Sequence, residues 1–447
     1  MSNSAEAKSS HAKSAEIFQR ACQVLPSGYT RHMVVTKPHP NYAASGDGCW
    51  ITDVDGNRLL DCVNNFTAMI HGHNKKEIID IICSQAPRIM SAIMPTEWEV
   101  KLAELLVERI PSVERVRFMN SGTEALMIAV KVGRAYSGRS KVAKAEGAYH
   151  GQYDLLEASY QPRPDQWGDP AAPTPVANSL GTPQSLLDEI VLFPTNNIEV
   201  TRNILRKRAS EIGTVVIDPC RLQLGLVQPR NDFLQMLREE TERLGMVLIF
   251  DEVLCLRMGY HGMQGRTGIT PDLTTMGKII GGGLPVGGLG GSAKVMSVFE
   301  VDAGEPKVKQ SGTFTANPMT MATGYTSMAL LTPEAFDDME RKSEHLREGL
   351  EKIRVDLGLV GRVEGIASLS VLLLTDKPMN NYRELAFAMG TGLLEKIGIM
   401  SKLFGEEGIL TLRGGFVAST PMTYDDIDFA LAGAHRALIR MKEMGAT

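Results

Sequence analysis

The sequence predicts an α/β protein with a large domain built on a mostly parallel sheet and a second, smaller domain. Between about residues 67 and 330, short apolar runs alternate with amphipathic segments, a rhythm typical of strands and helices in βαβ units. A chain of 447 residues also exceeds the size at which one hydrophobic core usually stops growing. We therefore predict a large domain over 67–330, with the segments 1–66 and 331–447 forming a smaller α+β domain.

The individual elements follow from periodicity and turn residues. Residues 49–63 hold two apolar runs joined by Asp55-Gly56, a pair suited to positive φ, and predict a β-hairpin. The stretch 161–180 contains five prolines and predicts a long irregular loop of the kind that often serves as a lid. Strands are predicted at 116–119, 141–144, 214–217 and 246–250. Helices are predicted at 15–24, 126–136, 233–244 and 334–354.

Composition and charge exclude several function classes. Lys and Arg total 47 against 52 Asp and Glu, a net charge of -5 that provides no basic surface for nucleic acid. The six cysteines form no C-x-x-C pair, so a zinc ribbon is excluded and reduced thiols are expected. The first 16 residues have no apolar run, so no secretory leader is expected, and no apolar stretch approaches the roughly 20 residues of a membrane span. We expect a cytoplasmic protein without a membrane, nucleic-acid or metal partner.

A first candidate site is the stretch 120–125, NSGTEA, which follows a predicted strand and opens a predicted helix. The unpaired N–H groups and the dipole at a helix N-terminus favour an anion such as phosphate. The same letters also form a capping box, with Ser121 as N-cap and Glu124 three residues later, which needs no ligand. The pattern alone leaves both interpretations open.

Two further stretches place polar residues just beyond strand ends. In 144–151, KAEGAYHG, an aromatic residue and a histidine lie between two glycines, which allow a flat ligand to approach closely. A purely structural role is the more common one for such a pair. In 245–253, GMVLIFDEV, an apolar run ends in Asp251 and Glu252. A buried strand that ends in Asp places a carboxylate where ligands of open α/β folds bind, and a buried carboxylate needs a cationic partner. A solvated loop is the alternative for either acid.

The stretch 271–288, PDLTTMGKIIGGGLPVGG, places Lys278 among apolar residues and glycines. Desolvation lowers the pKa of an ammonium group and frees the amine, so this lysine is a candidate Schiff-base nucleophile. A P-loop is excluded, because Asp272 stands where the motif requires Gly and Ile279 replaces its Ser or Thr. The stretch 288–293, GLGGSA, matches a dinucleotide fingerprint, but no acidic residue lies near position 313 to bind a ribose.

Together these stretches resemble the class III, fold-type I pyridoxal-phosphate aminotransferases, and more narrowly the branch of glutamate-1-semialdehyde aminomutases and β-amino acid transaminases. The resemblance spans roughly residues 26–428. It rests on five motifs in the family's order and spacing: NSGTEA, EGxYHG, FDEV, PDLTTxGKxIGGGxPVG and SGTF at 311–314. It implies a large domain with a seven-stranded, mostly parallel sheet covered by helices, and pyridoxal 5'-phosphate as the cofactor.

The resemblance also implies the catalytic residues and the assembly. Lys278 resembles the lysine that forms the Schiff base, and Asp251 resembles the carboxylate that pairs with the protonated pyridine nitrogen. Once the substrate amine has replaced it in the Schiff base, Lys278 is the group that moves the substrate proton. Thr313 resembles a phosphate ligand supplied by the neighbouring subunit, which implies a homodimer with a shared active site.

The remaining cofactor contacts are implied in the same way. Gly122 and Thr123 resemble the phosphate cup, and Tyr149 and Val253 resemble the residues packed on opposite faces of the ring. The complete predicted cofactor-binding set is Ser121, Gly122, Thr123, Tyr149, His150, Asp251, Val253, Lys278 and Thr313.

Two arginines are candidate substrate ligands. The stretch 26–31, PSGYTR, is similar to the branch's N-terminal loop, in which an arginine receives a substrate carboxylate, and here that residue is Arg31. The stretch 412–416, LRGGF, resembles a loop that offers a second arginine, here Arg413, although a plain surface arginine explains it equally well. We predict a ping-pong transaminase that moves an amino group from a carboxylate-bearing amine, with β- and ω-amino acids as candidates, to a keto acid.

Two departures from the family pattern bear on substrate choice. Residues 218–223, DPCRLQ, stand where many relatives have Glu-Pro followed by a Gln-Gly turn. Residues 64–67, NNFT, stand where the aminomutases usually carry a tryptophan-containing segment, which favours a transaminase. The alternatives are a glutamate-1-semialdehyde-like 2,1-aminomutase and, from other classes, a nucleotide-binding enzyme or a catalytically silent binding protein with the same fold.

Overall fold

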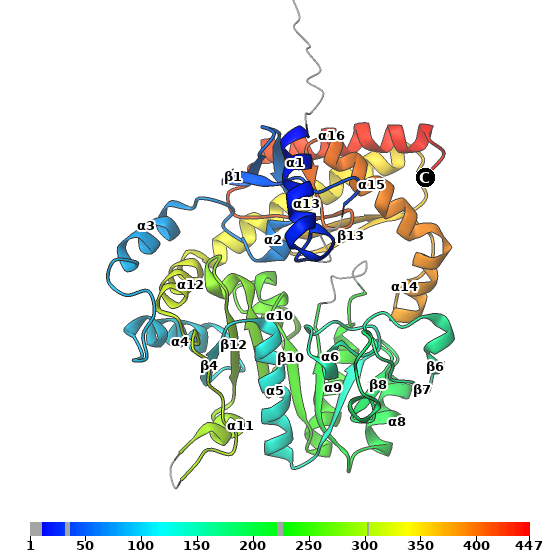
Figure 1. Cartoon of the computed structure of the whole chain (residues 1–447). Coiled ribbons are helices and arrows are strands. Elements are labelled where there is room, and N and C mark those ends of the chain that lie inside the picture. Colours follow the sequence, from blue (N-terminus) through cyan, green and yellow to red (C-terminus); the bar gives the residue numbers. More distant parts are fainter. Residues whose placement is uncertain (1–10, 32–35, 221–226, 302–303) are drawn as a thin grey trace, which may run out of the picture.

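The largest sheet, called the central sheet below, has seven strands from the middle of the chain and lies in the lower half of the molecule as drawn in Figure 1. The computed structural model describes residues 11–31, 36–220, 227–301 and 304–447. In spatial order the strands are β4 (Arg115–Met119), β12 (Gly287–Gly291), β11 (Leu273–Gly277), β10 (Val247–Asp251), β9 (Ile212–Ile217), β5 (Lys141–Ala145) and β8 (Ile190–Phe193). Neighbouring strands are parallel except where β12 takes part, so the predicted mostly parallel sheet is confirmed.

The strands β9 and β10 are buried along their whole length because helices cover both faces of the sheet. Along β10, Val247 and Ile249 share a core with α5 (Gly122–Ser137). Leu248 and Phe250 point the other way and share a core with α9 (Asn231–Leu244). Side chains alternate along a strand, so a strand covered on both faces has no polar side.

The predicted helix signals act as expected at α5. Ser121 is its N-cap, and the Ser121 hydroxyl accepts a hydrogen bond from the Glu124 N–H at 3.1 Å. The Glu124 carboxylate accepts the N–H of Asn120, one residue before the N-cap, at 2.8 Å. The helix ends at Gly138, whose φ of 69° lies in the left-handed region. These caps fix where α5 begins relative to β4.

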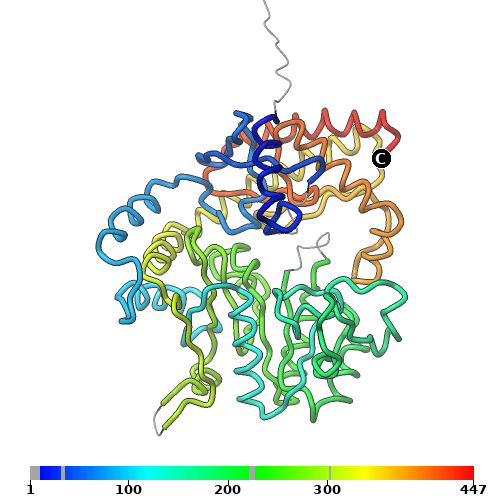
Figure 2. Tube along the Cα trace, in the orientation of Figure 1, coloured from blue at the N-terminus to red at the C-terminus, as the bar shows by residue number. Residues whose placement is uncertain are grey.

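The N-terminal and C-terminal segments lie together on one side of the central sheet (Figure 2), where they form two smaller sheets. The predicted hairpin is present, since β2 (Trp50–Asp53) pairs antiparallel with β3 (Arg58–Asp61). One sheet has the order β1 (Ala43–Asp47), β2, β3 and β15 (Ile409–Leu410), and the other the order β13 (Arg362–Ile366), β14 (Leu369–Leu373) and β16 (Gly415–Val417). The parallel pairing of β15 with β3 supports the predicted smaller domain of 1–66 and 331–447, which stays a prediction.

The proline-rich stretch 161–180 is less irregular than predicted. It contains a two-stranded sheet of β6 (Gly168–Asp169) and β7 (Ala172–Pro173). It also contacts α14 (Tyr382–Ala388), a helix of the C-terminal segment. There the Arg383 guanidinium donates to the Trp167 carbonyl and forms an ion pair with Glu146 at 2.9 Å. The stretch thus joins the central and terminal parts of the chain.

The predicted helices 15–24 and 334–354 correspond to the longer α1 (Ala12–Val24) and α13 (Pro333–Asp356). The other α-helices are α2 (Asn64–Thr67), α3 (Lys76–Gln85), α4 (Glu97–Arg109), α6 (Asp154–Glu157), α7 (Gln184–Leu187), α8 (Ile198–Lys207), α10 (Gly262–Thr267), α11 (Ala293–Met296), α12 (Pro318–Leu330), α15 (Leu394–Glu406) and α16 (Tyr424–Glu443). Within the described ranges, every helix is too short or too polar to cross a membrane.

Candidate active site

A pocket of about 420 Å³ opens at the carboxyl edge of the central sheet, beyond the ends of β9, β10 and β11. Eight of the predicted site residues line it: Arg31, Ser121, Gly122, Thr123, Tyr149, Asp251, Val253 and Lys278. Asn65, Gly151 and Asp218 line it as well. The pocket therefore gathers residues from the N-terminal segment and from the loops that follow five different strands, β4, β5, β9, β10 and β11.

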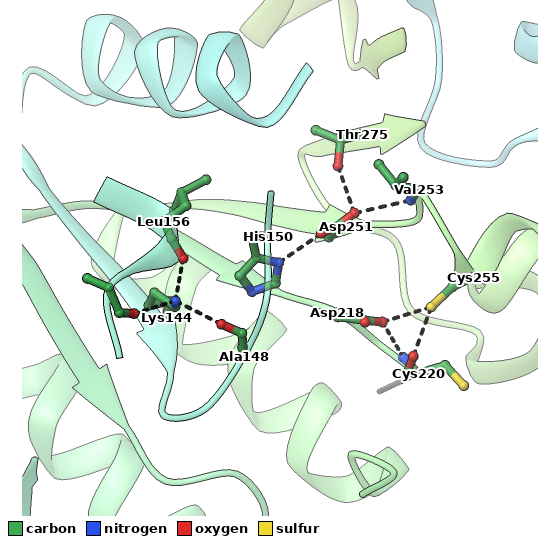
Figure 3. Close-up of polar contacts among 11 residues, drawn as sticks. Lys144, Ala148, His150, Leu156, Asp218, Cys220, Asp251, Val253, Cys255 and Thr275 are labelled. Atoms are coloured by element: carbon green, nitrogen blue, oxygen red, sulfur yellow. Dashed lines mark hydrogen bonds and ion pairs between the residues drawn. The ribbon is translucent and has the colours of Figure 1, made fainter. Parts of the chain in front are cut away.

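Asp251 is the last residue of β10 and is only 7% exposed. Its Oδ2 lies 2.8 Å from Nδ1 of the buried His150 (Figure 3). Its Oδ1 accepts the Val253 N–H at 3.1 Å and faces the Thr275 hydroxyl, which donates at 3.4 Å. These contacts hold the carboxylate in one orientation at the floor of the pocket.

Lys278 follows β11 directly and turns sharply out of the strand. Its φ of 50° lies in the left-handed region, which a non-glycine residue adopts only at some cost. Burial lowers the pKa of the Lys278 ammonium group, while the carboxylates of Asp251 and Asp218 act in the opposite direction. The neutral amine is thereby more accessible than in a solvent-exposed lysine.

The N-terminus of α5 faces the same pocket through Ser121, Gly122 and Thr123. A Cβ atom at Gly122 would lie 2.7 Å from a methyl group of Val253, so the residue must be glycine for the loop after β10 to pack there. The first N–H groups of a helix have no partner inside it and attract an anion. This end of the pocket is suited to a phosphate group.

These features fit pyridoxal 5'-phosphate. The pocket combines a lysine of lowered pKa for the aldehyde, a fixed buried carboxylate for the ring nitrogen and a helix N-terminus for the phosphate. The glycine at position 151 fits tightly, since a Cβ there would meet the Thr123 hydroxyl at 2.5 Å. Tyr149 and Val253 supply apolar surface to the same pocket.

A buried lysine near the site has a structural role. Lys144 is fully buried in β5, and its ammonium group donates to the carbonyl oxygens of Ala148, Leu156 and Ala158 (Figure 3). These bonds fix the loop that carries Tyr149. Lys144 does not line the pocket, unlike Lys278.

The unusual segment after β9 contributes an acid to the pocket. Asp218 Oδ1 accepts the Cys220 N–H at 2.9 Å and the Cys255 thiol at 2.8 Å (Figure 3). Burial raises the pKa of the Cys255 thiol well above its usual range, which keeps it protonated and able to donate. The other departures noted there, at Arg221 and at 222–223, lie outside the described residues.

Two residues were missed by the sequence reasoning. Thr275 reaches Asp251 because it is its register partner on β11. Asn65 lines the pocket and its Oδ1 accepts a hydrogen bond from Arg31 Nη1 at 2.9 Å. Asn65 belongs to a left-handed turn, a conformation that costs roughly 1–2 kcal/mol per residue. The Asn64-Asn65 pair was the available signal, since Asn tolerates that region.

Three predicted site residues do not line the pocket within this chain. His150 is hydrogen-bonded to Asp251 instead, and the cofactor contact predicted for it stays a prediction. Of the described residues, neither Thr313 nor Arg413 lines it. Thr313 lies exposed in the turn before α12. Arg413, with φ of 53°, lies at the tip of a turn closed by a bridge between Leu412 and Gly415. The roles predicted for both residues stay predictions.

Residues 34–418 match the family model of class III aminotransferases. The chain is 35% identical to glutamate-1-semialdehyde 2,1-aminomutase 1 of Bacillus cereus (strain G9842) over 437 residues, or 96% of this chain and 99% of that protein. It resembles the structure of an omega-transaminase from Sphaerobacter thermophilus, with a TM-score of 0.92 and 43% identity over 97% of this chain and 98% of that one. A beta-phenylalanine aminotransferase from Variovorax paradoxus gives a TM-score of 0.85 and 31% identity over 97% and 95%.

These similarities confirm the resemblance and the fold-type I architecture inferred from the five motifs. They extend over nearly the whole length of the chain and of the relatives. The lysine, the buried acid and the helix N-terminus that meet in the pocket fit the cofactor of that family. The chain belongs to the class III aminotransferases, enzymes that use pyridoxal 5'-phosphate.

Proposed function

We propose that this enzyme exchanges an amino group between a carboxylate-bearing amine and a keto acid in a two-substrate ping-pong cycle, with β- and ω-amino acids as candidate donors. The observation that carries the proposal is that Lys278, Asp251 and the N-terminus of α5 face one pocket. The similarity to an omega-transaminase and to a beta-phenylalanine aminotransferase supports the class of donor.

Lys278 is the proposed catalytic base. When bound, pyridoxal 5'-phosphate supplies an aldehyde for the amine and a ring that draws electrons from the substrate Cα–H bond. The lowered pKa of Lys278 leaves its amine able to accept the Cα proton, and the ammonium form can return that proton. Its position directly after β11 places Lys278 at the wall of the pocket.

Asp251 is proposed to bind the ring nitrogen and to keep it protonated. A fixed anion stabilises a neighbouring cation more than water does in a buried site. His150, the Val253 N–H and Thr275 hold the carboxylate so that it cannot turn away. Ser121, Gly122 and Thr123 at the start of α5 are proposed to bind the phosphate, with Tyr149 and Val253 against the ring.

Thr313 is proposed to complete the phosphate site of a second copy of this chain. Its neighbour Phe314 is 61% exposed, and the nearby Met90 is 65% exposed. The Asn317 side chain donates to the Met90 carbonyl at 2.9 Å, which joins the two exposed segments. Exposed apolar side chains that lie together are typical of an interface, so the arrangement supports a homodimer with a shared active site.

The proposed location is the cytoplasm. The six cysteines are free, which is expected of a protein kept in a reducing compartment.

Arg31 is the proposed ligand of the substrate carboxylate. It lines the pocket, and a guanidinium binds a carboxylate through two parallel hydrogen bonds. Arg413 stays a second candidate, alongside its interpretation as a plain surface residue. The 35% identity to an aminomutase keeps a 2,1-aminomutase as the alternative function, and the two differ in whether a separate keto acid is required.

Trapping the cofactor on the protein tests the role of Lys278. We expect borohydride reduction of the purified holoenzyme to fix the cofactor covalently on Lys278, and Lys278→Ala to lower the rate of amino transfer on the order of a thousandfold. Lys294→Ala, which removes an exposed lysine of α11, is the matched control and should behave as the unmodified enzyme. Full activity of Lys278→Ala would refute the assignment.

A panel of amino donors separates transaminase from mutase. For the proposed function, each accepted donor converts the cofactor to its amine form without a keto acid, and turnover then requires one. A mutase would turn over one substrate alone. A holoenzyme whose absorbance never responds to any donor would point to a silent binding protein.

A further inference from the structure

The short element α2 (Asn64–Thr67) is a single helical turn of left-handed sense at the rim of the pocket, unlike the other, right-handed helices. Its four consecutive residues have φ values between 46° and 75°, and none of them is glycine. Asn tolerates this region, but Phe66 and the β-branched Thr67 rarely adopt it. Backbone strain of this kind persists only where the surrounding structure over-determines it, and it is typical of functional sites.

Contacts from distant parts of the chain hold the turn in place. Asp61 Oδ1 accepts the Asn64 N–H at 2.9 Å. The buried Asn64 side chain donates to the Val417 carbonyl at 2.7 Å. Arg257 Nη1 donates to the Thr67 carbonyl at 2.9 Å. The strained backbone is therefore fixed at both ends.

Arg257 ties the turn to two further parts of the structure. Its guanidinium is fully buried and also donates to the Ser368 hydroxyl and to the Ala418 carbonyl. Burial lowers the pKa of Arg257 to about 9, so the group is still charged at neutral pH. A buried cation with several hydrogen bonds makes a rigid joint, since losing any bond would leave a charged donor unsatisfied.

Together these contacts fix the position of the Asn65 side chain. Asn65 is exposed on the pocket side of the turn, and its Oδ1 accepts the hydrogen bond from Arg31 Nη1 at 2.9 Å. Arg31 is otherwise a long, exposed side chain with many rotamers. A hydrogen bond to a fixed acceptor selects among them. The amide oxygen is neutral, so it orients the guanidinium without cancelling the charge that a substrate carboxylate would bind.

We propose that Asn65 is a positioning residue that directs Arg31 toward the substrate carboxylate, and that the left-handed turn of 64–67 serves to place it. The inference rests on the proposed role of Arg31. It makes the turn a determinant of specificity for carboxylate-bearing amines over amines that lack the carboxylate. An acid at position 65 would compete with the substrate for the guanidinium.

A pair of matched amines measures this specificity. The probes are 3-amino-3-phenylpropanoate and 1-phenylethylamine, which share the reacting carbon and the ring and differ by the carboxylate. With pyruvate as the common acceptor, the selectivity ratio is kcat/KM for the first amine divided by kcat/KM for the second. The affinity of the holoenzyme for 3-phenylpropanoate, read from the cofactor absorbance, is a second measurement that needs no turnover.

Asn65→Gly is the test variant, because glycine keeps the left-handed backbone and removes only the side chain. We expect it to lower the selectivity ratio about tenfold, mainly through KM for the carboxylate substrate, and to weaken 3-phenylpropanoate binding by a similar factor. Asn74→Gly is the matched control, since Asn74 is also an exposed asparagine with φ of 54° but lies outside the pocket. It should leave both quantities unchanged.

A double-mutant cycle with Arg31→Ala distinguishes the positioning role of Asn65 from the proposed role of Arg31 as the carboxylate ligand. If Asn65 acts through Arg31, Asn65→Gly has no further effect on the ratio in the Arg31→Ala background. A ratio that Arg31→Ala lowers but Asn65→Gly leaves intact overturns the inference alone. A ratio that Arg31→Ala itself leaves intact overturns the proposed role of Arg31, and the inference with it.

Discussion

Two neighbouring acids at the end of β10, Asp251 and Glu252, belong to polar networks on opposite sides of the sheet. On the pocket side, Asp251 contacts His150 and Thr275. On the far side, Glu252 accepts hydrogen bonds from the Met263 N–H at 2.8 Å and from the Gln264 side chain at 2.9 Å. Both acids are buried, and only Asp251 borders the ligand pocket.

The alternation of side chains along a strand produces this division. Residues 247 and 249 face α5, as does Asp251, whereas 248 and 250 face α9. The same alternation divides the adjacent threonines of β11. Thr275 bonds Asp251, while Thr274 bonds Gln264 and the Ser112 hydroxyl. The environment of each acid is therefore set by the face of the sheet that it occupies.

Replacing each acid by its amide should have the largest and most unequal effect. Asp251→Asn keeps the size of the side chain but removes the charge proposed to keep the ring nitrogen protonated. We expect the rate of amino transfer to fall on the order of a thousandfold. Glu252→Gln, the same chemical change one residue later, should alter the rate by less than about threefold, because the residue is outside the pocket.

Single-turnover rates, with cofactor loading checked by absorbance, measure both variants. Equal losses in the two variants would mean that the two acids share one function, and the distinction between the faces would be lost. A rate for Asp251→Asn within tenfold of the rate of the unmodified enzyme would refute the catalytic role proposed for Asp251.

The pH dependence of stability should separate the acids a second way. Burial raises the pKa of Glu252 from 4.5 to about 7, against the opposing effect of its hydrogen bonds. The folded protein therefore holds a proton that the unfolded chain releases between these values. This contribution stabilises the fold below about pH 4.5 and is lost as the pH rises through about 7.

Glu252→Gln cannot titrate and provides the test. As the pH rises from 4.5 to 8, the free energy of unfolding of the variant should increase by roughly 3 kcal/mol relative to that of the unmodified enzyme. Unfolding midpoints of the two holoenzymes across this range give the difference. Parallel stability curves would show that the Glu252 carboxyl does not titrate there.

The floor of the pocket was predictable because local patterns encode it. An apolar run that ends in Asp251, a lysine followed by glycines and a serine cap before Glu124 are each visible within a few residues. Secondary structure then brings them together, since the ends of parallel strands meet at one edge of the sheet. The predicted strands and helices of this part were correct to within a few residues.

The rim of the pocket was not predictable in the same way. Arg31 meets Asn65 across 34 residues of chain, and Arg257 meets Thr67 across 190. No local pattern specifies such pairs, which depend on how the terminal sheets pack against the central one. The separation of Asp251 from Glu252 also required the register of β10 with β11, which fixes Thr275 as the partner of Asp251.

Substitutions of the two threonines of β11 should have the smallest effects. Thr274→Val keeps the shape but leaves the Ser112 hydroxyl and the Gln264 amide with one partner fewer in a buried site, which costs about 1–3 kcal/mol of stability. Thr275→Val removes one long hydrogen bond to Asp251, so we expect less than about 1 kcal/mol of lost stability and a rate lowered about threefold.

Thermal unfolding measures the stability of the two threonine variants, and single-turnover kinetics measures their rates of amino transfer. We assign catalysis to the pocket face of the sheet and a structural role to the far face. A larger stability loss in Thr275→Val than in Thr274→Val would contradict this assignment, as would a larger rate loss in Thr274→Val. The valine pair is the more sensitive test of that assignment, because it changes neither charge nor volume and so reports only which network each hydroxyl serves.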